Sequence, residues 1–179
     1  MSQLKVNSII PVGGLVSGAN GGIIQVVSAT KTDTFSKSNV QSVDITGLSV
    51  TITPSSASNK ILIMYNVNLA SDASFGGDVL RLKRGSTDIC IGATDGSRIS
   101  GSNAVTQLMT GSNNTSYQGY STVNFFLDSP ATTSATTYKL NLYDDGANNT
   151  VVINRDLTDS NNTGRRRTAS TITAMEVST

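Results

Sequence analysis

The chain has 179 residues and a mass of 18.6 kDa, which is enough for one domain with one core plus an additional arm. Charged residues make up only 14% of it, histidine is absent, and Cys90 and Glu176 are the only cysteine and glutamate. These counts exclude a histidine-based catalytic triad, a His or Cys metal cage and a disulfide framework. The net charge of +1 argues against a nucleic-acid partner.

No segment has enough consecutive apolar residues for a signal peptide or a membrane span. We therefore expect a protein that is made in the cytoplasm without a signal peptide and is not inserted in a membrane. No pair of carboxylates is placed by the sequence at a working separation, so we predict no catalytic residue, no enzymatic activity and no cofactor.

Residues 1–22 are interrupted by Pro11 and by several glycines, which disfavour any long regular element. This composition predicts an extended N-terminal arm, followed by a head domain over residues 23–179. The arm nevertheless carries apolar side chains that a solvated linker would not need. We expect a partner to bury them, and the residues concerned are Leu4, Val6, Ile9, Ile10, Leu15 and Val16.

Beyond residue 22, short runs rich in Val, Ile, Thr, Tyr and Phe alternate with polar residues and are separated by Gly, Asn, Asp and Ser clusters. This period of two predicts β-strands, and no stretch has the periodicity of a three-turn helix. The predicted strands are Ile23–Thr34, Gly47–Thr53, Lys60–Leu69, Val79–Arg84, Thr87–Ile91, Tyr120–Asp128, Thr137–Tyr143, Thr150–Asn154 and Thr168–Val177.

The alternation also predicts which side chains face the core. Eight or nine strands without crossover helices favour two packed antiparallel sheets, that is, a jelly-roll-like β-sandwich. The predicted core residues are Leu48, Val50, Ile52, Ile61, Ile63, Tyr65, Val67, Leu69, Leu80, Leu82, Val123, Phe125, Leu127, Tyr138, Leu140, Leu142, Val151 and Ile153.

A second set of apolar side chains would then point outward, which is unusual for a sheet that faces water. A strand twist or a bulge that switches the alternation is one explanation. Burial of one sheet face against copies of the chain in a closed homotrimer is the other. The candidate interface residues are Leu62, Met64, Phe126, Met175 and Val177.

Two polar stretches, residues 93–118 and 156–167, are long enough to form an exposed tip. Either could be a solvated loop, or the two could bind a host-surface glycan through hydrogen bonds, arginine contacts and tyrosine stacking. The candidate receptor-binding residues are Arg98, Tyr117, Tyr120, Arg165, Arg166 and Arg167. Asp144, Asp145, Asn148 and Asn149, with Asp156 and Asp159, could hold a calcium ion or simply form turns, and we predict no metal site.

Several segments together resemble virion appendage proteins of marine tailed phages, especially cyanophages. These segments are MSQLKVNSII, GGIIQVV, GLSVTITPSSASNKILI, LKRGSTDICIG, FLDSPATTSATTYKL and RTASTITAMEV. The resemblance covers nearly the whole chain and is weakest over residues 93–118.

The resemblance implies a short tail fibre, spike or fibre-like structural subunit, usually trimeric, that is located in the virion. Its N-terminal segment would attach to other virion proteins in the tail, neck or capsid, and its head would bind a host receptor. A capsid decoration or head-fibre protein without a fixed ligand is the alternative, and a polysaccharide depolymerase is a third.

Overall fold

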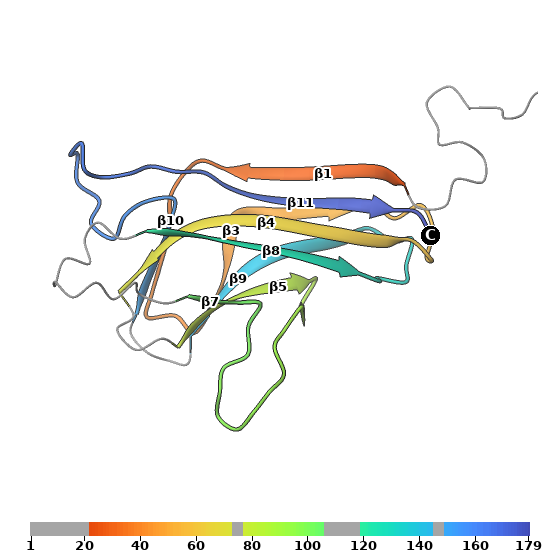
Figure 1. Cartoon of the computed structure of the whole chain (residues 1–179), viewed down its shortest axis with the longest axis horizontal. Coiled ribbons are helices and arrows are strands. Elements are labelled where there is room, and N and C mark those ends of the chain that lie inside the picture. The colour runs from red at the N-terminus through yellow and green to blue at the C-terminus, as the bar shows by residue number, and fades with distance from the viewer. Residues whose placement is uncertain (1–21, 73–76, 106–118, 145–148) are drawn as a thin grey trace, which may run out of the picture.

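The computed structural model describes residues 22–72, 77–105, 119–144 and 149–179, and it confirms the predicted all-β class. Within these ranges the chain forms strands and no helix (Figure 1). The predicted arm, apart from Gly22, lies outside the described residues, as does Tyr117. The strands are β1 (Ile23–Lys31), β2 (Phe35–Ser38), β3 (Ser42–Ile52), β4 (Lys60–Ser71), β5 (Asp78–Arg84), β6 (Thr87–Ile89), β7 (Asn103–Val105), β8 (Tyr120–Asp128), β9 (Thr136–Asp144), β10 (Thr150–Ile153) and β11 (Ser170–Val177).

The strands form two antiparallel sheets that pack into a sandwich. Sheet A has the order β1-β11-β4-β10-β2, with β8 also paired to β4, and sheet B has the order β3-β9-β5-β6, with β7 also paired to β5. The four long strands β1, β11, β4 and β8 lie side by side along the molecule (Figure 1). Because β1-β11-β4-β8 faces β3-β9-β5-β7, with the chain crossing repeatedly between the sheets, the topology is that of a jelly roll.

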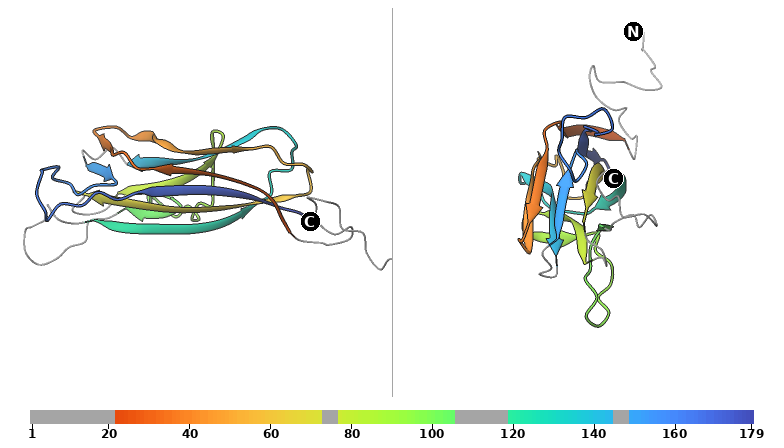
Figure 2. Two further views of the ribbon diagram at one scale, coloured as in Figure 1. Left: turned by 90° about the horizontal axis from the view of Figure 1, so that it is seen from above. Right: turned by 90° about the vertical axis from the view of Figure 1, so that its left-hand side faces the viewer.

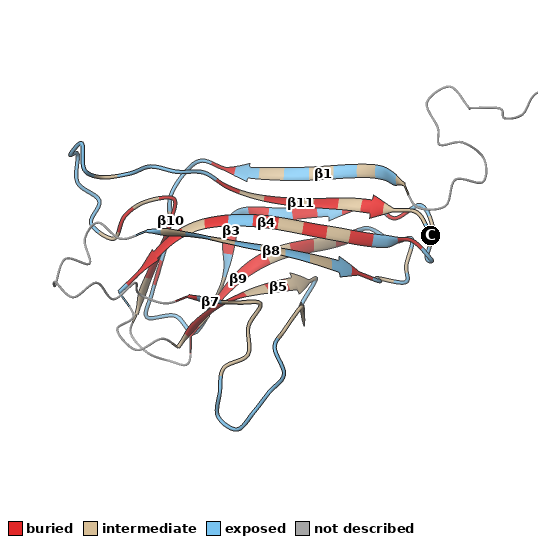
Figure 3. Ribbon diagram, in the orientation of Figure 1, coloured by how far each residue is buried: buried red, intermediate tan, exposed pale blue. Residues whose placement is uncertain are grey.

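The core lies between the sheets and is formed by alternate residues of each strand. Figure 3 shows this alternation as buried bands along β4 and β11. In β3, β4, β5, β9 and β10 the predicted inward faces are confirmed, since the members of each predicted set are buried. The largest fully buried side chains include Tyr138, Leu48, Ile63, Leu80, Leu140 and Ile172.

The predicted orientation of β8 is wrong. Phe125 is 60% exposed, and Val123 and Leu127 are also exposed, whereas Phe126 packs against the core. The inward face of β8 includes Asn124, whose amide Nδ2 donates to the main-chain oxygen of Ser102 at 3.2 Å. It also includes Asp128, which accepts hydrogen bonds from Arg84 and Tyr138. Partners inside the fold satisfy these polar groups, so the more apolar face of β8 points outward.

Two further differences concern the strands that follow β1. The predicted strand Ile23–Thr34 ends at Lys31, and the chain then forms the unpredicted short strand β2. Strand β3 begins at Ser42, five residues before the predicted start at Gly47. Gly47 has a φ of 86°, and the register with β9 shifts between Asp44 and Ser49. A conformation suited to glycine therefore lies within one long strand, where the sequence suggested a strand start.

The core assignment predicts a large loss of stability for Leu140→Ala. Leu140 is fully buried between the sheets, so its truncation should lower the free energy of unfolding by about 3 kcal/mol. Val40→Ala is the matched control, because Val40 is 46% exposed and should change stability by about 0.5 kcal/mol or less. Chemical denaturation measures both values. Equal, small losses in the two variants would contradict the assignment of this core.

Candidate functional site

The outer face of sheet A carries apolar side chains on all four of its long strands. Strand register places Val26, Met175, Leu62 and Leu127 in one row across β1, β11, β4 and β8. The next row contains Met64 and Phe125 beside two hydroxyl residues. We call this surface the apolar face, and its members are Val26, Leu62, Met64, Val123, Phe125, Leu127, Met175 and Val177.

The apolar face is exposed in the single chain, although its side chains gain nothing from contact with water. Val26 is 55% exposed, Leu127 is 48% exposed, and Leu62 and Met64 are half-buried. The row that ends at Leu127 is wholly apolar, and the rows that end at Phe125 and Val123 contain only Ser, Thr and Asn besides their apolar residues. None of these three rows contains a charged residue. Lys60, which pairs with Val177, places a charge only at the end of the face. An apolar surface with its charge at the edge is typical of a protein interface.

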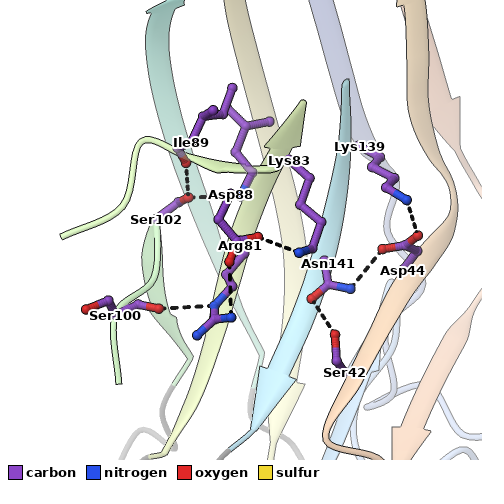
Figure 4. A network of polar contacts seen from close by, with 11 residues as sticks. Ser42, Asp44, Arg81, Lys83, Asp88, Ile89, Ser100, Ser102, Lys139 and Asn141 are labelled. Atoms are coloured by element: carbon purple, nitrogen blue, oxygen red, sulfur yellow. Dashed lines mark hydrogen bonds and ion pairs between the residues drawn. The ribbon is translucent and has the colours of Figure 1, made fainter. Parts of the chain in front are cut away.

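The outer face of sheet B has the opposite character. Figure 4 shows charged side chains on this face that pair with one another across neighbouring strands. Lys139 Nζ lies 2.5 Å from Asp44 Oδ2, Arg81 lies 3.2 Å from Asp88, and Lys83 also contacts Asp88. Such ion pairs suit a surface that faces solvent. The two outer faces of the sandwich are therefore chemically distinct.

The guanidinium of Arg81 also stacks on Tyr143, 3.6 Å from the ring centre. Partial burial alone would raise the pKa of Asp44, but hydrogen bonds from Lys139 and Asn141 outweigh this effect and hold the pKa below its usual value. Asp44 is therefore ionised at neutral pH, which preserves the charged character of this face.

Four of the five candidate interface residues belong to the apolar face. Leu62, Met64, Met175 and Val177 point outward, as the sequence predicted. The fifth, Phe126, points inward and packs against the core. Val26, Val123, Phe125 and Leu127 were missed, the last three because β8 was assigned the opposite face. The one signal in the sequence is that β8 also has aromatic residues, Tyr120 and Phe126, on the face opposite Val123, Phe125 and Leu127.

A second candidate site lies at one end of the sandwich, where β8 begins and the loop between β10 and β11 returns. A cavity of about 220 Å³ is lined there by Tyr120, Arg155, Asp156 and Arg166, among other residues. Asp156 is buried, and its carboxylate accepts a hydrogen bond from the main-chain nitrogen of Arg166 at 2.9 Å. The Arg166 guanidinium lies 3.2 Å from the same carboxylate. This arrangement holds a cavity at the loop end that is lined by both polar and apolar groups.

The structure brings together some of the predicted receptor-binding residues and separates another. Tyr120 and Arg166 line the cavity, and Arg165 and Arg167 line the adjoining polar hollow. Arg98 instead pairs with Asp95 in the loop between β6 and β7. That loop and the loop between β10 and β11 project on different sides of the molecule (Figure 2).

The acidic residues considered for a calcium site do not converge in the described part of the chain. Asp144 points to Lys37, Asp156 pairs with Arg166, and Asp159 pairs with Arg167. Asp145 and Asn148 lie outside the described residues. Among the residues that the structure describes, no three His, Cys, Asp or Glu side chains are grouped so as to hold a metal ion. The same residues contain no helix that is long and apolar enough to cross a bilayer.

Neither protein-family models nor curated proteins gave a match to this chain. Among solved structures, the chain is similar to one described as the structure of the Gx strain of infectious bursal disease virus, with 15% sequence identity and a TM-score of 0.36. The similarity covers 98% of this chain and 45% of the viral chain, so this protein spans less than half the length of that one. A similarity at this level assigns no family and no function.

The cavity depends on the buried carboxylate of Asp156, which predicts the effect of its removal. Asp156→Ala leaves the Arg166 main-chain N–H without its acceptor, so we expect a loss of about 1–3 kcal/mol in stability. Hydrogen exchange at the Arg166 amide should also become faster. Asp159→Ala is the control, because its exposed pair with Arg167 should contribute about 0.5 kcal/mol or less. Equal effects in the two variants would contradict the structural role of Asp156.

Proposed function

We propose that this chain is a non-enzymatic structural subunit of a phage virion appendage, and that it assembles as a homotrimer through the apolar face. The observation that carries the proposal is the contrast between the two outer faces of the sandwich, of which one is apolar and the other is covered by ion pairs. Residues 1–22 attach the subunit to other virion proteins. The resemblance of the sequence to phage appendage proteins supports the virion location and this attachment role.

A second copy of the chain is the partner that best fits the apolar face. Identical copies around a closed symmetry axis each present the same surface, so every apolar face can be covered without a second gene product. The uncharged rows of sheet A impose no electrostatic repulsion when copies meet. The charged outer face of sheet B remains in solvent and keeps the assembly soluble. A trimer also multiplies weak receptor contacts on a host surface.

The oligomeric state of purified protein tests this assembly. Light scattering at micromolar concentration should give three times the chain mass of 18.6 kDa. Phe125→Asp should reduce the mass to that of one chain, because the charge would have to be buried at the interface. Phe125 is 60% exposed in the single chain, so the variant should retain its strand signal in circular dichroism.

Ser49→Asp is the matched control for Phe125→Asp. It adds the same charge at an exposed position on the outer face of sheet B, opposite Lys139, and should leave the trimer intact. A monomeric wild-type chain contradicts the proposal. A Phe125→Asp variant that remains trimeric contradicts the assignment of the interface to the apolar face.

Receptor binding is the second part of the proposed function, and the cavity beside Tyr120 is its best-supported location. Tyrosine can stack on the apolar side of a sugar ring, while arginine and aspartate bond to sugar hydroxyls. Both polar and aromatic groups line this cavity at the end of the sandwich, where loops can vary without disturbing the core. A host-surface glycan is the ligand class with this chemistry.

Binding of purified protein to host cells tests the receptor role. The double variant Tyr120→Ala with Arg166→Ala should bind host cells at least several-fold more weakly, with its fold intact by circular dichroism. Arg98→Ala is the control, because Arg98 lies in a different loop and should leave binding unchanged. Absence of wild-type binding contradicts the receptor role and favours a capsid decoration protein without a fixed ligand. Release of new sugar chain ends from host polysaccharide favours a depolymerase instead.

A further inference from the structure

A lysine and two aspartates form a buried charged triad inside the sandwich. None of the three residues belongs to the apolar face or lines the cavity beside Tyr120. Lys37 Nζ lies 3.0 Å from Asp78 Oδ1 and 2.5 Å from Asp144 Oδ2. The exposed fractions of the three side chains are 0%, 1% and 0%. Burial of ionised groups is costly, and two carboxyls on one ammonium leave an excess acid in the interior. The triad therefore needs a physical explanation.

Strand register shows how the fold assembles the triad. In sheet A, Lys37 on β2 pairs with Val151, which in turn pairs with Ser71 on β4. In sheet B, Asp78 at the start of β5 pairs with Asp144 at the end of β9. The lysine thus reaches from one sheet to two adjacent acids of the other. Ser71 Oγ donates a 3.4 Å hydrogen bond to the second oxygen of Asp78, which fixes the orientation of that carboxyl.

The environment distinguishes the two acids. Burial raises the pKa of Asp78 above its ordinary value, and this effect outweighs the opposing hydrogen bond from Lys37, while the nearby charge of Asp144 raises the pKa further. Asp78 is thereby favoured as a neutral carboxylic acid. Asp144 is the acid that lies nearer to the Lys37 ammonium, so it is the one placed to accept a proton from it. A neutral acid is the form of a carboxyl that an amine can attack.

We propose that Lys37 and Asp78 join in an intramolecular isopeptide bond once the chain has folded. Asp144 accepts one proton from the Lys37 ammonium, which leaves a neutral amine. The amine nitrogen attacks Cγ of Asp78, the new N–C bond forms, and the bond from Cγ to the hydroxyl oxygen breaks. The hydroxyl leaves as water with a second nitrogen proton, and Asp144 retains the proton it accepted.

The reaction replaces an ammonium and a carboxylate by a neutral amide and a neutral acid, so the triad of Lys37, Asp78 and Asp144 no longer holds a charge. Fixed proximity of the reacting groups and exclusion of water from the sandwich both favour the condensation. The bond would connect β2 of sheet A to β5 of sheet B covalently. Such a link would keep the sandwich closed under heat, denaturant or mechanical load.

The mass of the purified, fully denatured wild-type chain tests the bond. We expect the mass to be lower than that of the sequence by one water. Acylated Lys37 resists trypsin, so digestion should give residues 32–60 as one uncut peptide, joined to residues 61–81 through Lys37 and Asp78. Lys31 is the internal control, because it is also buried but forms its ion pair with the exposed Asp33 and with no other acid among the described residues. Trypsin should therefore cleave after Lys31.

Lys37→Arg and Asp144→Asn test the two roles separately. The arginine variant lacks the nucleophilic amine and the asparagine variant lacks the proton acceptor, so each should have the full sequence mass. A wild-type chain with the full sequence mass overturns the proposal, whether or not the variants fold. A cross-link from Lys37 to the peptide of residues 140–155 overturns the assignment of Asp78 as the acceptor.

Discussion

Strand β4 has apolar side chains on both of its faces, and this property constrains the whole sandwich. Its inner face supplies Ile61, Ile63 and other members of the core, while its outer face carries Leu62 and Met64. It also pairs with β11, β8 and β10, so it lies at the centre of sheet A. Any arrangement that buries its inner face in the core leaves its outer face on the surface.

The neighbouring strands extend the apolar outer face of β4 across sheet A. Antiparallel register aligns Met175 and Leu127 with Leu62, and Phe125 with Met64. The outer face of sheet A is therefore apolar because three strands far apart in the sequence present matching residues. The paired charges on sheet B show that this chain can also build an ordinary solvated face. This difference between the sheets is the physical basis for the proposed assembly.

The sequence predicted the fold class and most of the core because, in β3, β4, β5, β9 and β10, the face with more large apolar side chains is the one that lies against the other sheet. It was misleading for β8, in which Val123, Phe125 and Leu127 alternate as core residues should. The inward position of Asn124 depends on partners contributed by the segment before β7, and these contacts are invisible to a local pattern. The arginine run was identified from sequence, but its pairing with particular aspartates depends on loop geometry.

Other buried polar groups of the sandwich also depend on partners that are distant in the sequence. Burial alone would raise the pKa of Glu176, but hydrogen bonds from Asn59 and Ser55 hold it below its usual value, so this carboxylate is buried with its partners. No local sequence pattern predicts these contacts, because the partners are more than a hundred residues away. The same reason explains why the triad of Lys37, Asp78 and Asp144 could not be recognised before the fold was known.

Hydroxyl-radical labelling of the intact, purified assembly tests most directly whether the apolar face is covered. Leu127 on that face and Val40 outside it have nearly equal exposures in the single chain, 48% and 46%. After correction for intrinsic reactivity, covering by other copies predicts that Val40 is labelled while Leu127 is protected to the level of the core residue Leu140. Equal labelling of Leu127 and Val40 would show that the face is open to water and would contradict the proposed assembly.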